Sequence, residues 1–144
     1  EDMLTPTLVC YIPLLMGTSG NAGNQAATLV TRGIAVGDLD TDDVFKILWK
    51  EFRISIGICL VLASINFIKV LVIDRVDITT AVIINLSLVI IVMIAKMLGG
   101  LIPMAAKKLG IDPALVANPL LTSLSDMISV VTYFAIASLM LTNV

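Results

Sequence analysis

Long apolar runs alternate with short polar connectors along the chain, and this pattern predicts four membrane-spanning helices. The runs cover about residues 7–31, 54–73, 78–103 and 113–141. At about 1.5 Å per residue, each is long enough to cross a hydrocarbon core of about 30 Å. Strand-like alternation is absent, which argues against a β-barrel. We therefore expect residues 1–144 to form one all-α domain, a polytopic transmembrane helix bundle.

Turn and cap residues mark the ends of these helices. The connector 37–43 is rich in Asp and Thr, and should cap a short amphipathic segment, 44–52, ahead of the second span. Pro103 is expected to end the third span. Asp112 and Pro113 suit the N-cap and first turn of the fourth.

The composition supports a membrane protein and excludes several other classes. Hydrophobic residues make up 58% of the chain and charged residues 14%, with a mean hydropathy of +1.06, whereas a soluble domain has about 25% charged residues. There is no His, and both Cys residues lie in apolar surroundings, which excludes a Cys/His zinc site. No basic stripe suggests nucleic-acid binding. No nucleophile–base constellation or phosphate-binding loop suggests an enzyme.

The distribution of basic residues predicts the orientation in the bilayer. The first and third connectors lie on the same side and hold six basic residues, against two, Lys69 and Arg75, in and just before the middle connector. By the positive-inside rule the six-residue side is cytoplasmic. Trp49 lies among these basic residues, as an interfacial anchor should.

Asp126 is the most informative residue, because it lies near the middle of the fourth span. An ionised carboxylate at that depth costs about 2.5–3.5 kcal/mol, so it needs water, a cation or a partner. Oxygen-bearing side chains follow one helix face around it: Asn118, Thr122, Ser125, Asp126 and Ser129. Such a stripe can line a hydrated path, or its hydroxyls and amides can join helices by hydrogen bonds. The central Asp favours the path.

The first span carries a second stripe of small and polar residues. Its members are Gly17, Gly20 or Asn21, Asn24, and Thr28. The glycines allow close backbone approach, and the amide and hydroxyl oxygens can face a cavity. The alternative is a tightly packed small-residue interface, and both interpretations can hold together.

The available ligands are all oxygens, which select hard cations. Mg²⁺ dehydrates reluctantly and is usually held through its waters by one or two carboxylates, whereas Ca²⁺ takes six to eight oxygens. A single Asp126 carboxylate per chain provides few ligands for a divalent cation. We therefore infer a symmetric homodimer with two Asp126 carboxylates across a central axis.

Another class of protein remains open, a non-conducting helix-bundle scaffold in which Asp126 pairs with Lys96. Lys96 is the one basic residue within the spans that could reach Asp126. We expect Lys96 to lie nearer the cytoplasmic end and to snorkel toward water, which disfavours this pair.

Two long segments, Pro13 to Leu39 and Leu109 to Phe134, strongly resemble the MgtE family of bacterial Mg²⁺ channels. They read PLLMGTSGNAGNQAATLVTRGIAVGDL and LGIDPALVANPLLTSLSDMISVVTYF. The Lys50–Glu51 pair fits as well, and the resemblance covers nearly the whole chain. Eukaryotic solute-carrier magnesium transporters share a looser version of these segments.

The resemblance implies a multi-pass inner-membrane homodimer with a pore on its two-fold axis, lined by the first and fourth spans. Asp126 falls where the family binds hydrated Mg²⁺, and Thr122 where a backbone carbonyl contributes. Further matched pore positions are Asn24, Thr28, Asn118, Gly17 and Gly20. Asp112 and Glu51 fall at the cytoplasmic end, where family members sense internal Mg²⁺, although a capping or surface role fits them equally.

Family members have five transmembrane helices, so the four spans would be the second to fifth. The resemblance implies that the cytoplasmic N-terminal and CBS regulatory domains, and the first transmembrane helix, are not represented in this sequence. We therefore predict a passive Mg²⁺-selective channel domain, and the alternative is an ion-coupled Mg²⁺ carrier. Mn²⁺, Co²⁺ or Ni²⁺ are not excluded as further ions.

Overall fold

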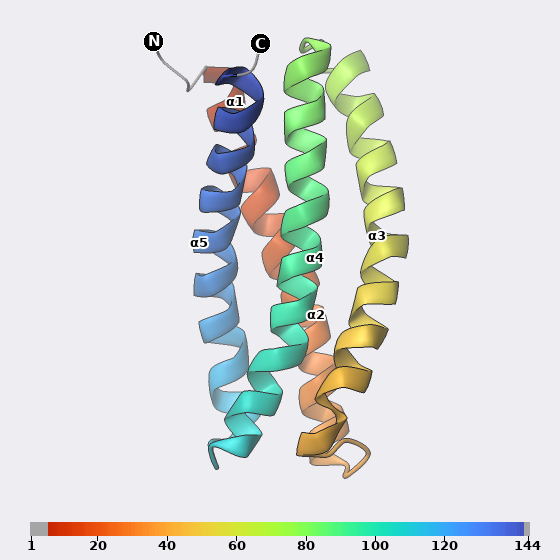
Figure 1. Ribbon diagram of the computed structural model, residues 1–144, viewed down its shortest axis with the longest axis vertical. Helices are drawn as coiled ribbons and strands as arrows, with labels where there is room; N and C mark the ends of the chain where they lie inside the picture. Colours follow the sequence, from red (N-terminus) through yellow and green to blue (C-terminus); the bar gives the residue numbers. More distant parts are fainter. Residues whose placement is uncertain (1–5, 143–144) are drawn as a thin grey trace.

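The structure, a computed structural model, describes residues 6–142 except the side chain of Val116. This part of the chain is helical apart from its connectors, which confirms the all-α prediction. Four long helices lie side by side, with the α2–α3 and α4–α5 connectors at one end and the α3–α4 turn at the other (Figure 1). The elements are α1 (Pro6–Cys10), α2 (Ile12–Ala35), the 3₁₀ helix η1 (Thr41–Asp43), α3 (Val44–Val72), α4 (Ile78–Lys108) and α5 (Pro113–Thr142).

Three helical segments within the described residues are long and apolar enough to cross a membrane: Thr41–Val72, Ile78–Lys108 and Ala117–Thr142. Helix α2 has 24 residues, but it contains the polar stretch 17–28, which lowers its hydropathy. That stretch is helical throughout, and the helix break falls earlier, at Tyr11. The four predicted runs thus correspond to four long helices.

Two predicted boundaries are wrong. The amphipathic segment 44–52 and the second span form one continuous helix, because Ile47, Glu51 and Ser55 repeat every fourth residue as its buried face. Pro103 does not end the third span, and α4 continues to Lys108. The residues after Pro103 are held by packing, since Met104 is buried against the ends of α2 and α3.

Helix α4 occupies the centre of the bundle. It contacts α2, α3 and α5, whereas α3 packs mainly against α4. The approach of α2 to α4 depends on two glycines, because a Cβ at Gly99 would lie 2.3 Å from the carbonyl oxygen of Gly23. The α2–α4 spacing therefore requires glycine at position 99.

Charged side chains tie the connectors together at one end of the bundle. Lys107 Nζ donates hydrogen bonds to the carbonyl oxygen of Leu39 and to the Asp40 carboxylate, each at 3.0 Å. The hydrogen bond from Lys107, with one from the Thr41 backbone, lowers the pKa of Asp40. This contact joins the α2–α3 connector to the end of α4.

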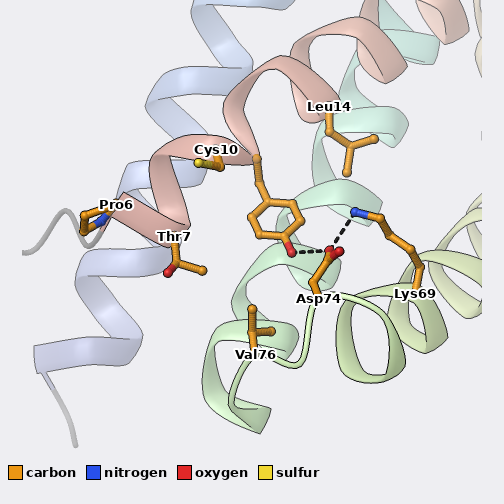
Figure 2. A pocket seen from close by; sticks show the side chains of 8 residues that line it. Pro6, Thr7, Cys10, Leu14, Lys69, Asp74 and Val76 are labelled. Carbon is orange, nitrogen blue, oxygen red and sulfur yellow. Dashed lines mark hydrogen bonds and ion pairs between the residues drawn. The ribbon is translucent and has the colours of Figure 1, made fainter.

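A second cluster joins the start of the described chain to the α3–α4 turn (Figure 2). The Asp74 carboxylate accepts hydrogen bonds from Lys69 Nζ at 2.6 Å and from the Tyr11 hydroxyl. Both bonds, that of Lys69 first, lower the pKa of Asp74. These side chains line a pocket of about 490 Å³ at this end. The cluster fixes the break between α1 and α2 against the turn.

Candidate ion-conducting face of α2 and α5

The polar residues of α5 lie beside its buried face. The buried positions recur every fourth residue: Ala117, Leu121, Ser125, Ser129, Tyr133 and Ala137. Asn118, Thr122 and Asp126 each follow one of these by a single residue. Asn118 and Thr122 are exposed and Asp126 is partly exposed. They therefore form a column along the edge of the helix packing.

The predicted stripe on α5 divides into two parts with different surroundings. Ser129 is buried, and its hydroxyl lies 2.8 Å from the Ser19 hydroxyl of α2. It also donates to the carbonyl oxygen of Ser125. Ser129 thus joins α2 to α5 by hydrogen bonding, which was the alternative interpretation of the stripe.

The two predicted stripes meet at Asn24 and Thr122. Asn24 Nδ2 donates to Thr122 Oγ1 at 3.3 Å, and Thr122 Oγ1 donates to the carbonyl oxygen of Asn118 at 3.0 Å. Asn24 Oδ1 is buried and has no hydrogen-bond partner among the described residues. An unpaired amide oxygen therefore lies next to the polar column of α5, enclosed by the described chain.

The other predicted residues of α2 lie on two different sides. Gly17 and Thr28 are exposed, and a Cβ at Gly17 or at the buried Gly20 would meet nothing within 4 Å. Asn21 instead lines a pocket of about 470 Å³ between α2 and α3. The structure therefore brings Asn24 to the polar column of α5, and it places Asn21 on the α3 side.

Asp126 lies near the middle of the 30-residue helix α5. Among residues 6–142 its carboxylate has no hydrogen bond and no ion pair. An ionised carboxylate with no partner at this depth is costly in a bilayer. Its charge therefore calls for water, a cation or another chain.

Lys96 does not pair with Asp126, and the expectation that it snorkels is wrong. Its ammonium lies 2.9 Å from Glu51 Oε2, and the two side chains are only 1% and 2% exposed. The contact is an ion pair without hydrogen-bond geometry, since that carboxylate oxygen accepts no hydrogen bond. The buried face of the continuous α3 points Glu51 at α4, so that the opposite charges meet inside the bundle.

The two residues proposed as cytoplasmic Mg²⁺ contacts differ in accessibility. Asp112 is exposed, and its Oδ1 accepts a hydrogen bond from the Ala114 backbone at 2.9 Å, as a cap at the start of α5. Glu51 is enclosed with Lys96 and is not open to solution. The pairing of Glu51 with Lys96 was not predicted from the sequence, although an acid and a base in neighbouring apolar helices were its signal.

Carboxylates alone do not form a metal site within one chain. The described residues contain no group of three or more His, Cys, Asp or Glu side chains that could hold a metal ion. Any cation near Asp126 would therefore be held by one carboxylate, with neutral oxygens, water or a second chain completing its surroundings.

Asn24 of α2 and the column Asn118, Thr122 and Asp126 of α5 form one polar surface, called here the α2–α5 face. Together these features define a multi-pass helical membrane protein with an unpaired carboxylate on that face. Residues 12–136 match the model of the MgtE family, described as divalent cation transporters, and the chain belongs to this family. The resemblance seen in the sequence is confirmed, and the family is one of transporters rather than enzymes.

Three curated relatives are bacterial proteins named magnesium transporter MgtE. The protein of Thermus thermophilus is 40% identical over 93% of this chain, and that of Bacillus subtilis is 32% identical over 96%. The protein of Enterococcus faecalis is 31% identical over 92% of this chain. The matched regions make up 29%, 31% and 29% of these relatives, so the chain spans less than a third of their length.

Proposed function

We propose that this chain is the ion-conducting domain of a Mg²⁺ channel in a bacterial inner membrane. Hydrated Mg²⁺ would pass along the polar α2–α5 face, through a pore on the two-fold axis of a homodimer. The observation that carries the proposal is the Asp126 carboxylate, which lies mid-helix with no counter-charge among the described residues. A divalent cation removes the cost of holding that charge in the membrane.

The neighbouring side chains suit a hydrated ion rather than a stripped one. Thr122 is exposed beside Asn24, and Asn118 is exposed one turn before it on α5. These oxygens can accept hydrogen bonds from the water shell that Mg²⁺ releases reluctantly. Asp126 would supply the charge and the amides and hydroxyls would orient the shell.

A second copy of the chain completes the site in this proposal. The α2–α5 face carries polar side chains that the described chain leaves uncovered, and the open space beside Gly17 and Gly20 leaves room for a neighbouring helix. A two-fold axis along this face would set two Asp126 carboxylates on opposite sides of one path. Protein sites commonly hold Mg²⁺ through one or two carboxylates, so this number suits the ion.

No energy source is required for uptake through such a path. A membrane potential of 100 mV gives about 2.3 kcal/mol per charge, hence about 4.6 kcal/mol for a divalent ion moving inward. The driving force is therefore electrical, and the protein needs only to supply a selective route.

The test is Mg²⁺ flux into vesicles that contain the purified protein. An imposed negative-inside potential should drive uptake without any counter-ion gradient, and Asp126→Asn should reduce it at least tenfold. Asp42→Asn removes an exposed carboxylate of η1, which has no predicted role in Mg²⁺ binding, and should leave flux unchanged. Uptake that requires a counter-ion gradient would favour the carrier, and full flux in Asp126→Asn would exclude the proposed site.

A further inference from the structure

A basic pocket lies on the outer surface of α3, away from the α2–α5 face. Its volume is about 630 Å³, and it is lined by Lys46, Trp49, Lys50, Arg53 and Ile54. These residues recur at intervals of three and four, so they share one face of the helix. All five are exposed.

The positive charge of this pocket is largely uncompensated. Lys50 and Arg53 have no ion pair among the described residues. Lys46 lies 3.8 Å from Asp43, but its side chain is 76% exposed, and a pair of this kind is weak. Trp49 stacks on Phe52 with ring centroids 5.8 Å apart, which holds its indole in place between the cations.

The same face of α3 continues as an uncovered apolar strip. Toward the C-terminal end of α3, after the basic residues, it presents Gly57, Leu60, Val61 and Ile68, all of them exposed. A Cβ at Gly57 would meet nothing within 4 Å, so a shallow notch follows directly after Arg53. Because α3 packs mainly against α4, no other described helix covers this strip.

The length of α3 places the pocket at the edge of the bilayer. Its 29 residues extend about 44 Å, whereas the hydrocarbon core is about 30 Å thick. Its first turns therefore reach the headgroup layer. The basic connectors indicate that this is the cytoplasmic side, where anionic lipids attract clustered Lys and Arg.

We propose that this pocket binds the phosphate headgroup of an anionic phospholipid. Lys50 and Arg53 would contact the phosphate, with Arg53 able to bind two of its oxygens. Trp49 would lie at the level of the glycerol backbone, and an acyl chain would run along Gly57 and Leu60. The site depends on the protein spanning a membrane and is independent of ion conduction.

Trp49 provides the test, because it is the single tryptophan of the 144 residues. Its fluorescence is measured in vesicles of phosphatidylglycerol and phosphatidylcholine in which one lipid or the other carries brominated, quenching acyl chains. Quenching by brominated phosphatidylglycerol should exceed quenching by brominated phosphatidylcholine at equal mole fraction. The preference should be severalfold at low salt, and weaken as salt is added.

The variant Lys50→Gln with Arg53→Gln should remove this preference, so that the two brominated lipids quench Trp49 to the same extent. The matched control is Arg32→Gln with Lys108→Gln, which removes two exposed basic residues outside the pocket and should retain the preference. Loss of the preference in both variants would mean general surface attraction and overturn the proposal. Retention in the pocket variant, or a Trp49 that neither lipid quenches because protein covers it, would overturn it as well.

Discussion

At the scale of single residues, hydrogen bonding separates side chains that join helices from side chains left free for another role. Ser19 and Ser129 pair inside the bundle, while Asn24 reaches Thr122 with one amide atom and leaves the other unpartnered. Asp126 lies one residue after the buried Ser125 and has no partner among residues 6–142. A shift of one residue along α5 thus separates packing from the candidate path.

Ser129→Ala tests this separation. We expect the free energy of unfolding to fall by about 0.5–1.5 kcal/mol, because the Ser19 hydroxyl loses its partner on α5, while Mg²⁺ flux stays unchanged. Unfolding in mixed micelles and flux in vesicles measure the two effects. Ser123→Ala is the control, since Ser123 is exposed and bonds only within α5. Lost flux with unchanged stability would place Ser129 in the path instead.

At the scale of helices, the Glu51–Lys96 ion pair joins α3 to α4, as does the buried hydrogen bond from Asn66 Nδ2 to Asn85 Oδ1. Both side chains of the ion pair are almost wholly enclosed. A buried ion pair is weak evidence for stability as such, but removing one partner leaves an uncompensated charge. The pair therefore favours one register of α3 against α4.

Glu51→Gln should lower the free energy of unfolding by about 3–5 kcal/mol, because Lys96 is left charged and buried. The double variant Glu51→Leu with Lys96→Met should recover most of this loss. Lys46→Met, which breaks an exposed pair, should change stability by less than about 1 kcal/mol. Unfolding in detergent measures all three. A small effect of Glu51→Gln would show that water reaches the pair.

The helices themselves were predictable from the sequence, whereas their contacts were not. Apolar runs of membrane length lead directly to four long helices. The end of α4 was missed because packing around Met104 outweighs the local effect of Pro103. Lys96 pairs with Glu51, which lies 45 positions away in the sequence. Asn21 lies on the α3 side of α2, whereas Asn24 lies on the α5 side. Both outcomes depend on how neighbouring helices are rotated, which one helix's periodicity does not determine.

At the scale of the whole molecule, the α2–α5 face is the part of the bundle that a second copy would complete. Gly17 and Gly20 open onto space in the described chain, in contrast to Gly99, which is packed against α2. A side chain added at Gly17 would therefore disturb a neighbouring molecule rather than its own fold.

Gly17→Leu tests the homodimer through this contrast. We expect unfolding of the single chain to be unaffected and both dimer formation and Mg²⁺ flux to decrease. Gly57→Leu is the matched control, because it adds the same side chain in open space on the outer face of α3. Molecular mass in detergent and flux in vesicles report the outcome. Equal effects of the two substitutions would argue against a dimer at the α2–α5 face.

The most direct measurement is the stabilisation of the protein by Mg²⁺, compared between the parent chain and Asp126→Asn. A ligand at one hundred times its Kd adds about 2.7 kcal/mol to the free energy of unfolding. The parent should gain stability of this order, and Asp126→Asn should lose most of it, while Asp42→Asn should behave as the parent. Equal stabilisation of the parent and Asp126→Asn by Mg²⁺ would show that Asp126 does not bind the ion.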